Sequence, residues 1–357
     1  MSLAPVRMAD LAGRHARVAE AAERGVLEVL RSGRAVGGPV VSEAERSLAN
    51  VFGWAHAVGV NSGTDALVLA LQAVGVRPGD EVIVPAVSFF ATAGAVVRAG
   101  AVPVIADVRE DAPLLDPEAL PLTTRTRAVV AVHLFGARCG LPALPVPIVD
   151  DLAQAIGADP PARTGGIGAA SFYPTKTLGA AGDAGIVLAD DLDLADRARR
   201  LANHGLVAPH VHEDVDGVIG INSRLDAVQA AVLLAHLADL PARVARRRAL
   251  ASRYDAALPA GIRRLPREPG HPVHQYVVRV PSRDRVHAHL AAAGIETAVY
   301  YPRSLAAQPA LARWARPTPR ADAFCAECLA LPVHEGLTDG EVDRVVDALV
   351  LAWKECT

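Results

Sequence analysis

The stretch around Lys176 is the strongest candidate for a catalytic site in the sequence. A short apolar run ends at Ser171, and the residues Ser171-Phe-Tyr-Pro-Thr-Lys176 then lead into three closely spaced glycines. A lysine held on a stiff turn among small residues can lose its solvent shell, and a desolvated amine is suited to forming a Schiff base. On these residues alone, an ordinary surface turn is an equal alternative.

Ser62, Gly63 and Thr64 form a second candidate site. They follow an apolar run over residues 57–60 and open a helix that we expect over residues 66–74. The free N–H groups and the dipole of a helix N-terminus favour an anion, so these residues are candidates for holding a phosphate. Simple helix capping by Ser62 or Thr64, which needs no ligand, is the alternative. The stretch matches neither the P-loop nor the dinucleotide-binding glycine pattern.

Two carboxylates, Asp150 and Asp151, end a further apolar run, and Phe89 ends another. In an open α/β sheet, ligands bind at the carboxyl ends of the strands. A buried carboxylate needs a cationic or hydrogen-bonding partner there, and a protonated pyridine nitrogen would be one; helix capping is the alternative. Phe89 could stack on a flat ring, although packing in the core is the commoner fate of such a residue.

These features occur along the chain in the order phosphate seat, aromatic ring, acid and lysine. Pyridoxal 5′-phosphate (PLP) needs such a set: an anion site, a stacking face, a partner for the pyridine nitrogen and an amine that forms an imine.

The elements expected to position these residues are α/β in pattern. From residue 57 onward, short apolar runs alternate with helical segments, which indicates a mostly parallel sheet buried on both faces. The runs span residues 57–60, 81–84, 102–106, 128–132, 146–149 and 186–189. Helices are expected over 14–31, 42–52, 223–258 with a break at Pro241, 283–293 and 339–353.

Apolar runs at 276–280 and 298–301 flank the helix expected over 283–293, which indicates a smaller α+β domain after the α/β one. We therefore expect a large domain over residues 1–245 and a small C-terminal domain over residues 246–357.

Composition sets further limits. The chain has 357 residues, of which 51% are hydrophobic and 21% charged, with a formal net charge of −3. No basic stripe suggests a nucleic-acid partner, and no run of about 18 apolar residues suggests a membrane span. We expect a cytoplasmic protein with reduced cysteines. The pair Cys325 and Cys328 has metal-site spacing but lacks a second pair or a nearby histidine, so no metal site is expected.

The chain resembles the DegT/DnrJ/StrS family of sugar aminotransferases, which have the fold type I architecture of PLP-dependent enzymes. The resemblance runs from about Gly33 to His334. It rests on motifs in a fixed order: Ser62-Gly-Thr-Asp-Ala-Leu, Pro78-Gly-Asp-Glu-Val-Ile-Val-Pro85, Val132-His-Leu-Phe-Gly136, Asp151-Leu-Ala-Gln154, Ser171-Phe-Tyr-Pro-Thr-Lys176 and Gly220-Ile-Asn-Ser-Arg-Leu-Asp226.

The resemblance implies a role for each matching residue. Lys176 matches the Schiff-base lysine and proton shuttle, and Asp151 the acid that keeps the pyridine nitrogen protonated. The remaining matches are Phe89 on the ring, Gln154 near the ring hydroxyl, Ser62, Gly63, Thr64 and Ser171 at the phosphate, and Asn222, which reaches the phosphate of the neighbouring subunit. The active unit implied is a homodimer.

The reaction implied is a ping-pong transamination. Glutamate or glutamine converts PLP to pyridoxamine phosphate (PMP), which then aminates a keto-sugar, with a nucleotide-linked 3- or 4-keto-hexose as the expected substrate. Two alternatives stay open: a keto-cyclitol of the scyllo-inosose type as acceptor, and a non-catalytic regulatory protein on the same fold.

Three departures from the family pattern are visible. Asp150 stands where the family commonly has Glu, and Ala306 stands where it often has His in a loop near the substrate. The segment between Gly136 and Asp150 is also short, so we expect that a helix usually present there is lost or reduced. His133 and His204 match positions often occupied by His in relatives and could line the pocket, although structural roles are equally plausible.

Overall fold

A seven-stranded sheet with the order β1-β7-β6-β5-β4-β2-β3 forms the centre of the protein, whose computed structural model describes residues 4–356. Only β7 runs antiparallel to its neighbours β1 and β6. The strands are β1 His56–Val60, β2 Glu81–Pro85, β3 Val102–Ala106, β4 Thr126–Val132, β5 Ile148–Asp151, β6 Ile167–Ser171 and β7 Gly185–Ala189. The expected α/β class with a mostly parallel sheet is confirmed.

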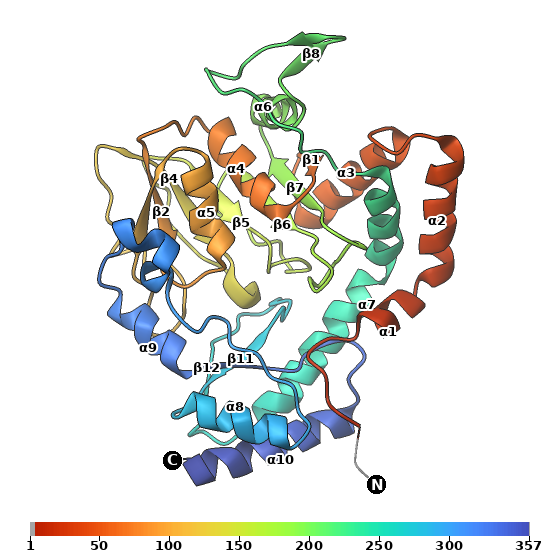
Figure 1. Cartoon of the computed structure of the whole chain (residues 1–357). Helices are drawn as coiled ribbons and strands as arrows, with labels where there is room; N and C mark the ends of the chain where they lie inside the picture. Colours follow the sequence, from red (N-terminus) through yellow and green to blue (C-terminus); the bar gives the residue numbers. More distant parts are fainter. Residues whose placement is uncertain (1–3, 357) are drawn as a thin grey trace.

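Helices cover this sheet and continue into the C-terminal part of the chain (Figure 1). They are α1 Leu11–Ala16, α2 Ala19–Ser32, α3 Pro39–Phe52, α4 Gly63–Ala73, α5 Phe90–Arg98, α6 Leu192–Ala202, α7 Ala227–Ala257, α8 Arg283–Ala292, α9 Pro319–Glu327 and α10 Asp339–Cys356, with short 3₁₀ turns η1 Leu134–Gly136, η2 Leu305–Ala307 and η3 Pro309–Trp314. As expected, no helix lies between Gly136 and β5.

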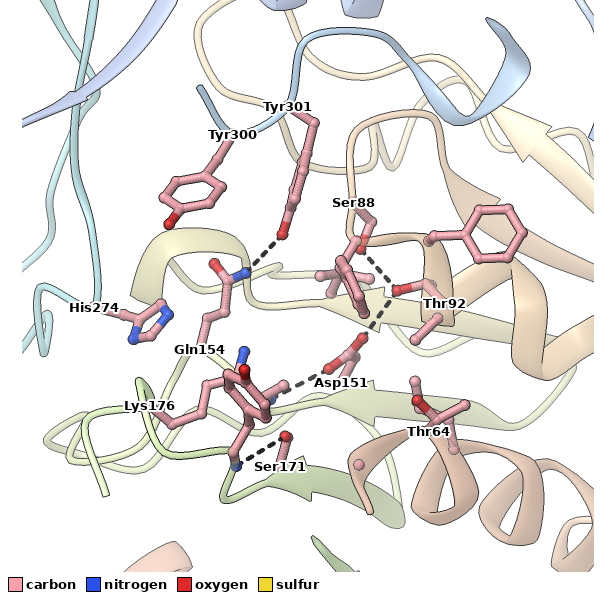
Figure 2. Close-up of a pocket in the computed structure, with 18 of the residues that line it drawn as sticks. Thr64, Ser88, Thr92, Asp151, Gln154, Ser171, Lys176, His274, Tyr300 and Tyr301 are labelled. Carbon is pink, nitrogen blue, oxygen red and sulfur yellow. Dashed lines mark hydrogen bonds between the residues drawn. The ribbon is translucent and has the colours of Figure 1, made fainter. Parts of the chain in front are cut away.

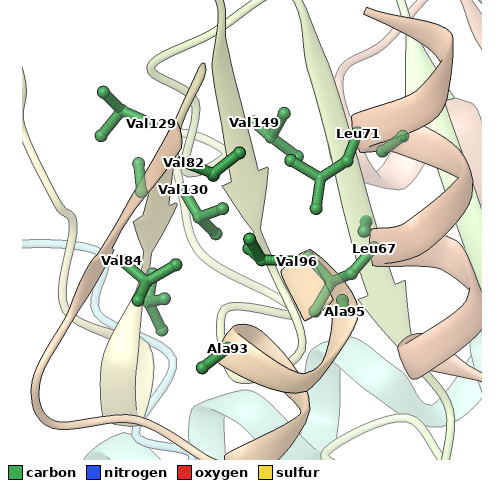
Figure 3. Packing of buried hydrophobic residues seen from close by; sticks show 14 of the residues in the cluster. Leu67, Leu71, Val82, Val84, Ala93, Ala95, Val96, Val129, Val130 and Val149 are labelled. Atoms are coloured by element: carbon green, nitrogen blue, oxygen red, sulfur yellow. The ribbon is translucent and has the colours of Figure 1, made fainter. Parts of the chain in front are cut away.

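The core explains why the strands are near-continuous apolar runs. Val82 of β2 and Val130 of β4 lie under Leu67 and Leu71 of α4 and Val96 of α5, and all five side chains are buried (Figure 3). Branched side chains pack well on a pleated surface and helices shield the faces of a parallel sheet from water, so such strands need no polar face. This rigid packing fixes the strand ends at which the candidate residues lie.

The first expected helix, over residues 14–31, is in fact two helices. Helix α1 ends at Ala16 and α2 begins at Ala19, with Arg17 and Val18 between them. The side chains of Arg14 and Arg17 bind partners on different elements, Glu335 and Asp239. These long-range contacts separate α1 from α2. Because they leave no trace in the helical periodicity of the sequence, the sequence did not reveal the break.

The expected break at Pro241 is wrong, because α7 runs unbroken through this residue. Pro241 is exposed, whereas Leu240 and Val244 beside it are buried against the protein. A proline on the solvent side of a helix removes one hydrogen bond but can be accommodated when the opposite face is anchored. Among the described helices, α7 alone has the length and apolarity of a membrane span; it packs along α2 and α3 (Figure 1), as core helices of the same composition do.

A second, antiparallel sheet β10-β11-β12 lies in the C-terminal part of the chain, beside α8 and α10 (Figure 1). Its strands are β10 Arg263–Arg264, β11 Tyr276–Arg279 and β12 Cys328–Leu331. The apolar run at 298–301 forms no strand: Ala298 makes a single bridge with Ala330, and residues 299–302 then line the cavity beside the large sheet.

We propose that the chain divides near residue 245. A separate hydrophobic cluster, built from Val6 and from residues between Leu250 and Ala352, supports this boundary, although α7 itself runs through it.

A hairpin of β8 Leu206–Ala208 and β9 Val211–His212, which the sequence did not suggest, projects beyond α6 (Figure 1).

Candidate active site

A cavity of about 700 Å³ lies at the carboxyl ends of the central strands. The segments that follow β1, β2, β5 and β6 line one side of it, and residues 274–275 and 299–302 from the C-terminal part line the other (Figure 2). All of the predicted site residues except Asn222 line this cavity: Ser62, Gly63, Thr64, Phe89, Asp151, Gln154, Ser171 and Lys176. The topology therefore brings together residues that are more than one hundred positions apart in the sequence.

Lys176 is half-buried on a turn that follows β6. The turn is closed by a hydrogen bond from the N–H of Lys176 to the carbonyl of Tyr173, at 2.8 Å. Burial lowers the pKa of Lys176, and the negative charge of Asp151 acts in the opposite direction. An amine whose pKa is lowered by desolvation is a better nucleophile near neutral pH than an ordinary surface lysine.

Asp151 ends β5 and is buried at the floor of the cavity. Its carboxylate accepts hydrogen bonds from the backbone N–H of Ala153, at 3.2 Å, and from the hydroxyl of Thr92, at 3.1 Å. Burial raises the pKa of Asp151, while Ala153, Lys176 and Thr92 oppose this shift. A carboxylate that is buried without an ion pair at hydrogen-bonding distance is suited to a cationic group of a ligand.

The first turn of α4 forms one end of the cavity. Ser62 is the N-cap and accepts a hydrogen bond from the N–H of Asp65, at 3.2 Å, while the first helical hydrogen bond joins the N–H of Ala66 to the carbonyl of Ser62. The N–H groups of Gly63 and Thr64 precede this bond, so they are free to bind an anion.

Gly63 allows the start of α4 to approach β6 closely. A Cβ atom at Gly63 would lie 2.4 Å from the Cβ of Ser171. The hydroxyl of Ser171 and the first turn of α4 therefore meet at a single point, as a phosphate site requires.

Gln154 and Phe89 both approach Tyr301. The Oε1 atom of Gln154 accepts a hydrogen bond from the N–H of Phe135, at 2.6 Å, and its Nε2 donates to the Tyr301 hydroxyl, at 3.2 Å (Figure 2). Phe89 is 58% exposed, and its ring centroid lies 6.3 Å from that of Tyr301. An aromatic ring that is this exposed inside a cavity can stack on a flat ligand.

Asn222 is exposed and does not line the cavity of its own chain. It forms a bridge with Asn203, the residue that directly follows α6.

His133 and His204 do not line the cavity either. His133 is fully buried, and its Nε2 lies 2.9 Å from Asp150, while its Nδ1 accepts from the N–H of Cys139. The interpretation of His133 as a structural residue is therefore the correct one, and the shorter acid Asp150 serves as its partner.

Cys325 and Cys328 are not on one helix, because Cys325 lies in α9 and Cys328 opens β12. Both are buried, and burial raises their pKa values to about 12 and about 11, respectively, so neither thiol is poised to react. Within residues 4–356, no group of three or more His, Cys, Asp or Glu residues is arranged to hold a metal ion.

Sequence reasoning missed several residues of the cavity wall, among them Ser88, Thr92, His274, Tyr300 and Tyr301. Thr92 lies three residues after Phe89, one helical turn into α5, which is a signal that could have been used. His274 and the two tyrosines come from the C-terminal part, whose docking over the sheet leaves no local signal in the sequence.

The cavity fits PLP by its own chemistry. It has free N–H groups at a helix start for a phosphate, a buried carboxylate for a protonated pyridine nitrogen, an exposed aromatic ring and a lysine whose pKa is lowered. The close approach of Gly63 to Ser171 forms a cradle that a side chain at position 63 would fill.

Comparison with known proteins agrees with this assignment. The model of the DegT/DnrJ/EryC1/StrS aminotransferase family matches residues 17–350. A dTDP-3-amino-3,4,6-trideoxy-alpha-D-glucose transaminase of Streptomyces venezuelae is 40% identical over 371 residues, which cover 97% of this chain and 95% of the relative. A pleiotropic regulatory protein of Geobacillus stearothermophilus is 36% identical over 366 residues, 96% of this chain and 97% of that protein.

Two solved structures extend the comparison. S. venezuelae DesV in complex with a ketimine intermediate has a TM-score of 0.91 and 38% identity, covering 98% of this chain and 99% of that one. NtdA of Bacillus subtilis with bound cofactor PMP has a TM-score of 0.90 and 27% identity, covering 99% and 86%. The fold of this chain is thus that of PLP-dependent sugar aminotransferases.

Proposed function

The chain belongs to the DegT/DnrJ/EryC1/StrS aminotransferase family, and we propose that its cavity transfers an amino group from glutamate or glutamine to a nucleotide-linked keto-sugar. The protein is a PLP-dependent aminotransferase. The observation that carries the proposal is that Lys176 and Asp151 line one cavity and influence each other's pKa.

In this proposal each residue of the cavity has a separate task. Asp151 pairs with the pyridine nitrogen, Phe89 packs on the ring, and Gln154 lies near the ring hydroxyl. The phosphate is held by Ser62, Gly63, Thr64 and Ser171. When bound, PLP supplies an electron sink for the bonding electrons at the Cα of an amino acid, and a buried, ionised Asp151 sustains that property.

Lys176 has two tasks in the proposal. In the resting protein its side-chain nitrogen would hold the cofactor covalently. Once the amino group of the donor has replaced it there, the freed neutral amine would take the proton from the Cα of the donor. The lowered pKa of Lys176 supports this role, because a general base works best when its pKa lies near the working pH. The C-terminal wall, with Tyr300 and Tyr301, limits the access of water to this amine.

We further propose that the active unit is a homodimer in which Asn222 binds the phosphate in the neighbouring subunit. No Arg lines the cavity among the described residues, so within one chain only N–H and hydroxyl groups would offset the phosphate charge. Asn222 is exposed, and so are the nearby apolar side chains of Ile219, at 77%, and Ile221. Large exposed apolar side chains grouped in this way are typical of contact surfaces.

Mixing two inactive variants tests the dimer. Lys176→Ala and Asn222→Ala chains, unfolded and refolded together, should recover activity, because some mixed dimers hold one site with both residues. Absence of recovery, with both variants folded, would contradict a shared site.

The acceptor is tested with PMP-loaded protein. Nucleotide-linked 3-keto and 4-keto sugars should each be compared with a keto-cyclitol for return of the visible absorbance of PLP. We expect return only with a nucleotide-linked sugar; return with the cyclitol alone would assign the alternative substrate. A protein that binds PMP but responds to no acceptor or donor would support the regulatory alternative, which the presence of both Lys176 and Asp151 opposes. We expect all of this chemistry to take place in the cytoplasm, in keeping with four free cysteines.

A further inference from the structure

We propose that Arg14 is a positioning residue that fixes Lys176 through the backbone of its turn. Arg14 lies on α1 and is 4% exposed. Its Nη1 donates hydrogen bonds to the carbonyls of Pro174 and Lys176, at 3.0 and 2.8 Å, and its Nε donates to Glu335, at 2.5 Å. One guanidinium thus binds the carbonyl of the lysine itself and a carbonyl two residues before it.

The turn needs such support because it is neither helix nor strand. It is closed by the N–H of Lys176 on the carbonyl of Tyr173 and by the N–H of Ala180 on the carbonyl of Phe172, each at 2.8 Å. Both of these bonds join residues of the turn to each other. The two hydrogen bonds from Arg14 connect the turn to a distant part of the chain, so they help to fix the positions of its Cα atoms.

Glu335 joins Arg14 to the opposite wall of the cavity. Its second oxygen pairs with Arg247 of α7, at 3.4 Å. Arg247 in turn donates to the carbonyls of Val273 and His274, each at 3.2 Å, and His274 lines the cavity.

The side chains of Arg14, Glu335 and Arg247 are all at most 5% exposed. These three buried side chains therefore hold the turn that carries Lys176 and the segment 273–274 in fixed positions relative to each other.

A planar guanidinium suits this task better than an ammonium group. Arg presents several N–H donors in a fixed fork, whereas Lys is a compact charge on a flexible stem. Replacing Arg14 by Lys keeps a positive charge beside Glu335. It removes the guanidinium, whose N–H groups bind two backbone carbonyls and the Glu335 carboxylate at the same time. The inference rests on the proposed role of Lys176 and adds to it a residue at the other end of the sequence.

The test compares Arg14→Ala and Arg14→Lys with Arg17→Ala. Arg17 is a matched control, because it lies three residues after Arg14, at the end of α1, and pairs with Asp239 of α7, yet it forms no hydrogen bond with the lysine turn. Three quantities are measured for each variant: the thermal midpoint without cofactor, the dissociation constant of PLP, and the pH midpoint of the visible band of bound PLP.

We expect both Arg14 variants to weaken PLP binding by about tenfold or more, since two hydrogen bonds from a charged donor are lost or misplaced. We also expect the pH midpoint of the band to move by at least about half a unit, because the amine shifts relative to Asp151. Arg14→Lys should keep a thermal midpoint near that of the unaltered protein. Arg17→Ala should change the thermal midpoint alone.

Two results would overturn the inference: an unchanged affinity and pH midpoint in Arg14→Lys, or equal effects of Arg14→Ala and Arg17→Ala on PLP. If the unaltered protein shows no visible band that depends on Lys176, the proposed role of Lys176 is what fails, and this outcome is recognised before any Arg14 variant is compared.

Discussion

Thr92 and Asp151 are joined by a hydrogen bond of 3.1 Å in which the hydroxyl donates to the carboxylate. The hydroxyl group of Thr92 has a single proton, and the hydrogen bond to Asp151 uses it. In the 2.7 Å hydrogen bond between Ser88 and Thr92, Ser88 must therefore be the donor. Ser88 and Thr92, which follow β2, thus form a chain of two hydrogen bonds that ends at Asp151. The hydrogen bond from Thr92 lowers the pKa of Asp151 and so opposes the larger effect of burial, which raises it.

Replacing Thr92 by Val should weaken PLP binding by about tenfold, the effect of one hydrogen bond to a charged acceptor. Valine has nearly the shape of threonine, so packing is preserved and the loss reports the hydrogen bond. Equilibrium titration with PLP measures the effect. Ser88→Ala is the control, because it removes only the outer contact and should have a smaller effect; affinity equal to that of the unaltered protein in Thr92→Val would contradict this role of the Thr92 hydroxyl.

Replacing Gly63 by Ala should damage the proposed phosphate site. The new Cβ would lie 2.4 Å from the Cβ of Ser171, so α4 and β6 must separate. We expect weaker binding of PLP with a smaller loss for pyridoxal, which lacks the phosphate. Gly140→Ala is a suitable control, because a Cβ there meets nothing within 4 Å. Equal losses for PLP and pyridoxal would show that the damage does not concern the phosphate.

Glu335→Gln should lower stability in a pH-dependent way. Burial alone would raise the pKa of Glu335, but Arg247 and Arg14 lower it from 4.5 to about 2. A carboxylate with a lowered pKa stabilises the folded state fully above its unfolded pKa and loses this effect as pH falls through the folded pKa. The shift corresponds to about 3 kcal/mol.

Denaturant titrations at several pH values measure this contribution. The difference between Glu335→Gln and the unaltered protein should be largest at neutral pH and shrink from pH 4.5 downward toward pH 2. Glu20→Gln provides the comparison, because Glu20 forms an exposed pair with Arg24 and should have little effect at any pH. A difference that stays constant between pH 7 and pH 3 would rule out the ionised Glu335 as its source.

Much of the sheet could be predicted from the sequence, because buried parallel strands appear as short apolar runs. Asp151 and Ser171 stand at the ends of such runs, and the helix start at Ser62 follows one. Their common location follows from topology, since parallel strands end at one edge.

The features of the fold and of the cavity that the sequence did not predict depend on long-range contacts, which leave no periodic pattern in the sequence. The break after α1 reflects partners at Asp239 and Glu335, and the unbroken α7 reflects burial around Pro241 that outweighs a lost hydrogen bond. Tyr301 reaches Gln154 only because the C-terminal part packs over the sheet. Local sequence reasoning cannot reveal such pairs.

The most direct test uses the absorbance spectrum of PLP-loaded protein before and after addition of glutamate. The chain has two lysines, Lys176 and Lys354, so Lys354→Ala is a matched control for Lys176→Ala. We expect a visible band that glutamate converts to the shorter-wavelength band of PMP, both in the unaltered protein and in Lys354→Ala. Borohydride reduction should place the cofactor on Lys176. A band that persists in Lys176→Ala, or reduction that labels Lys354 instead, would show that Lys176 does not bind the cofactor.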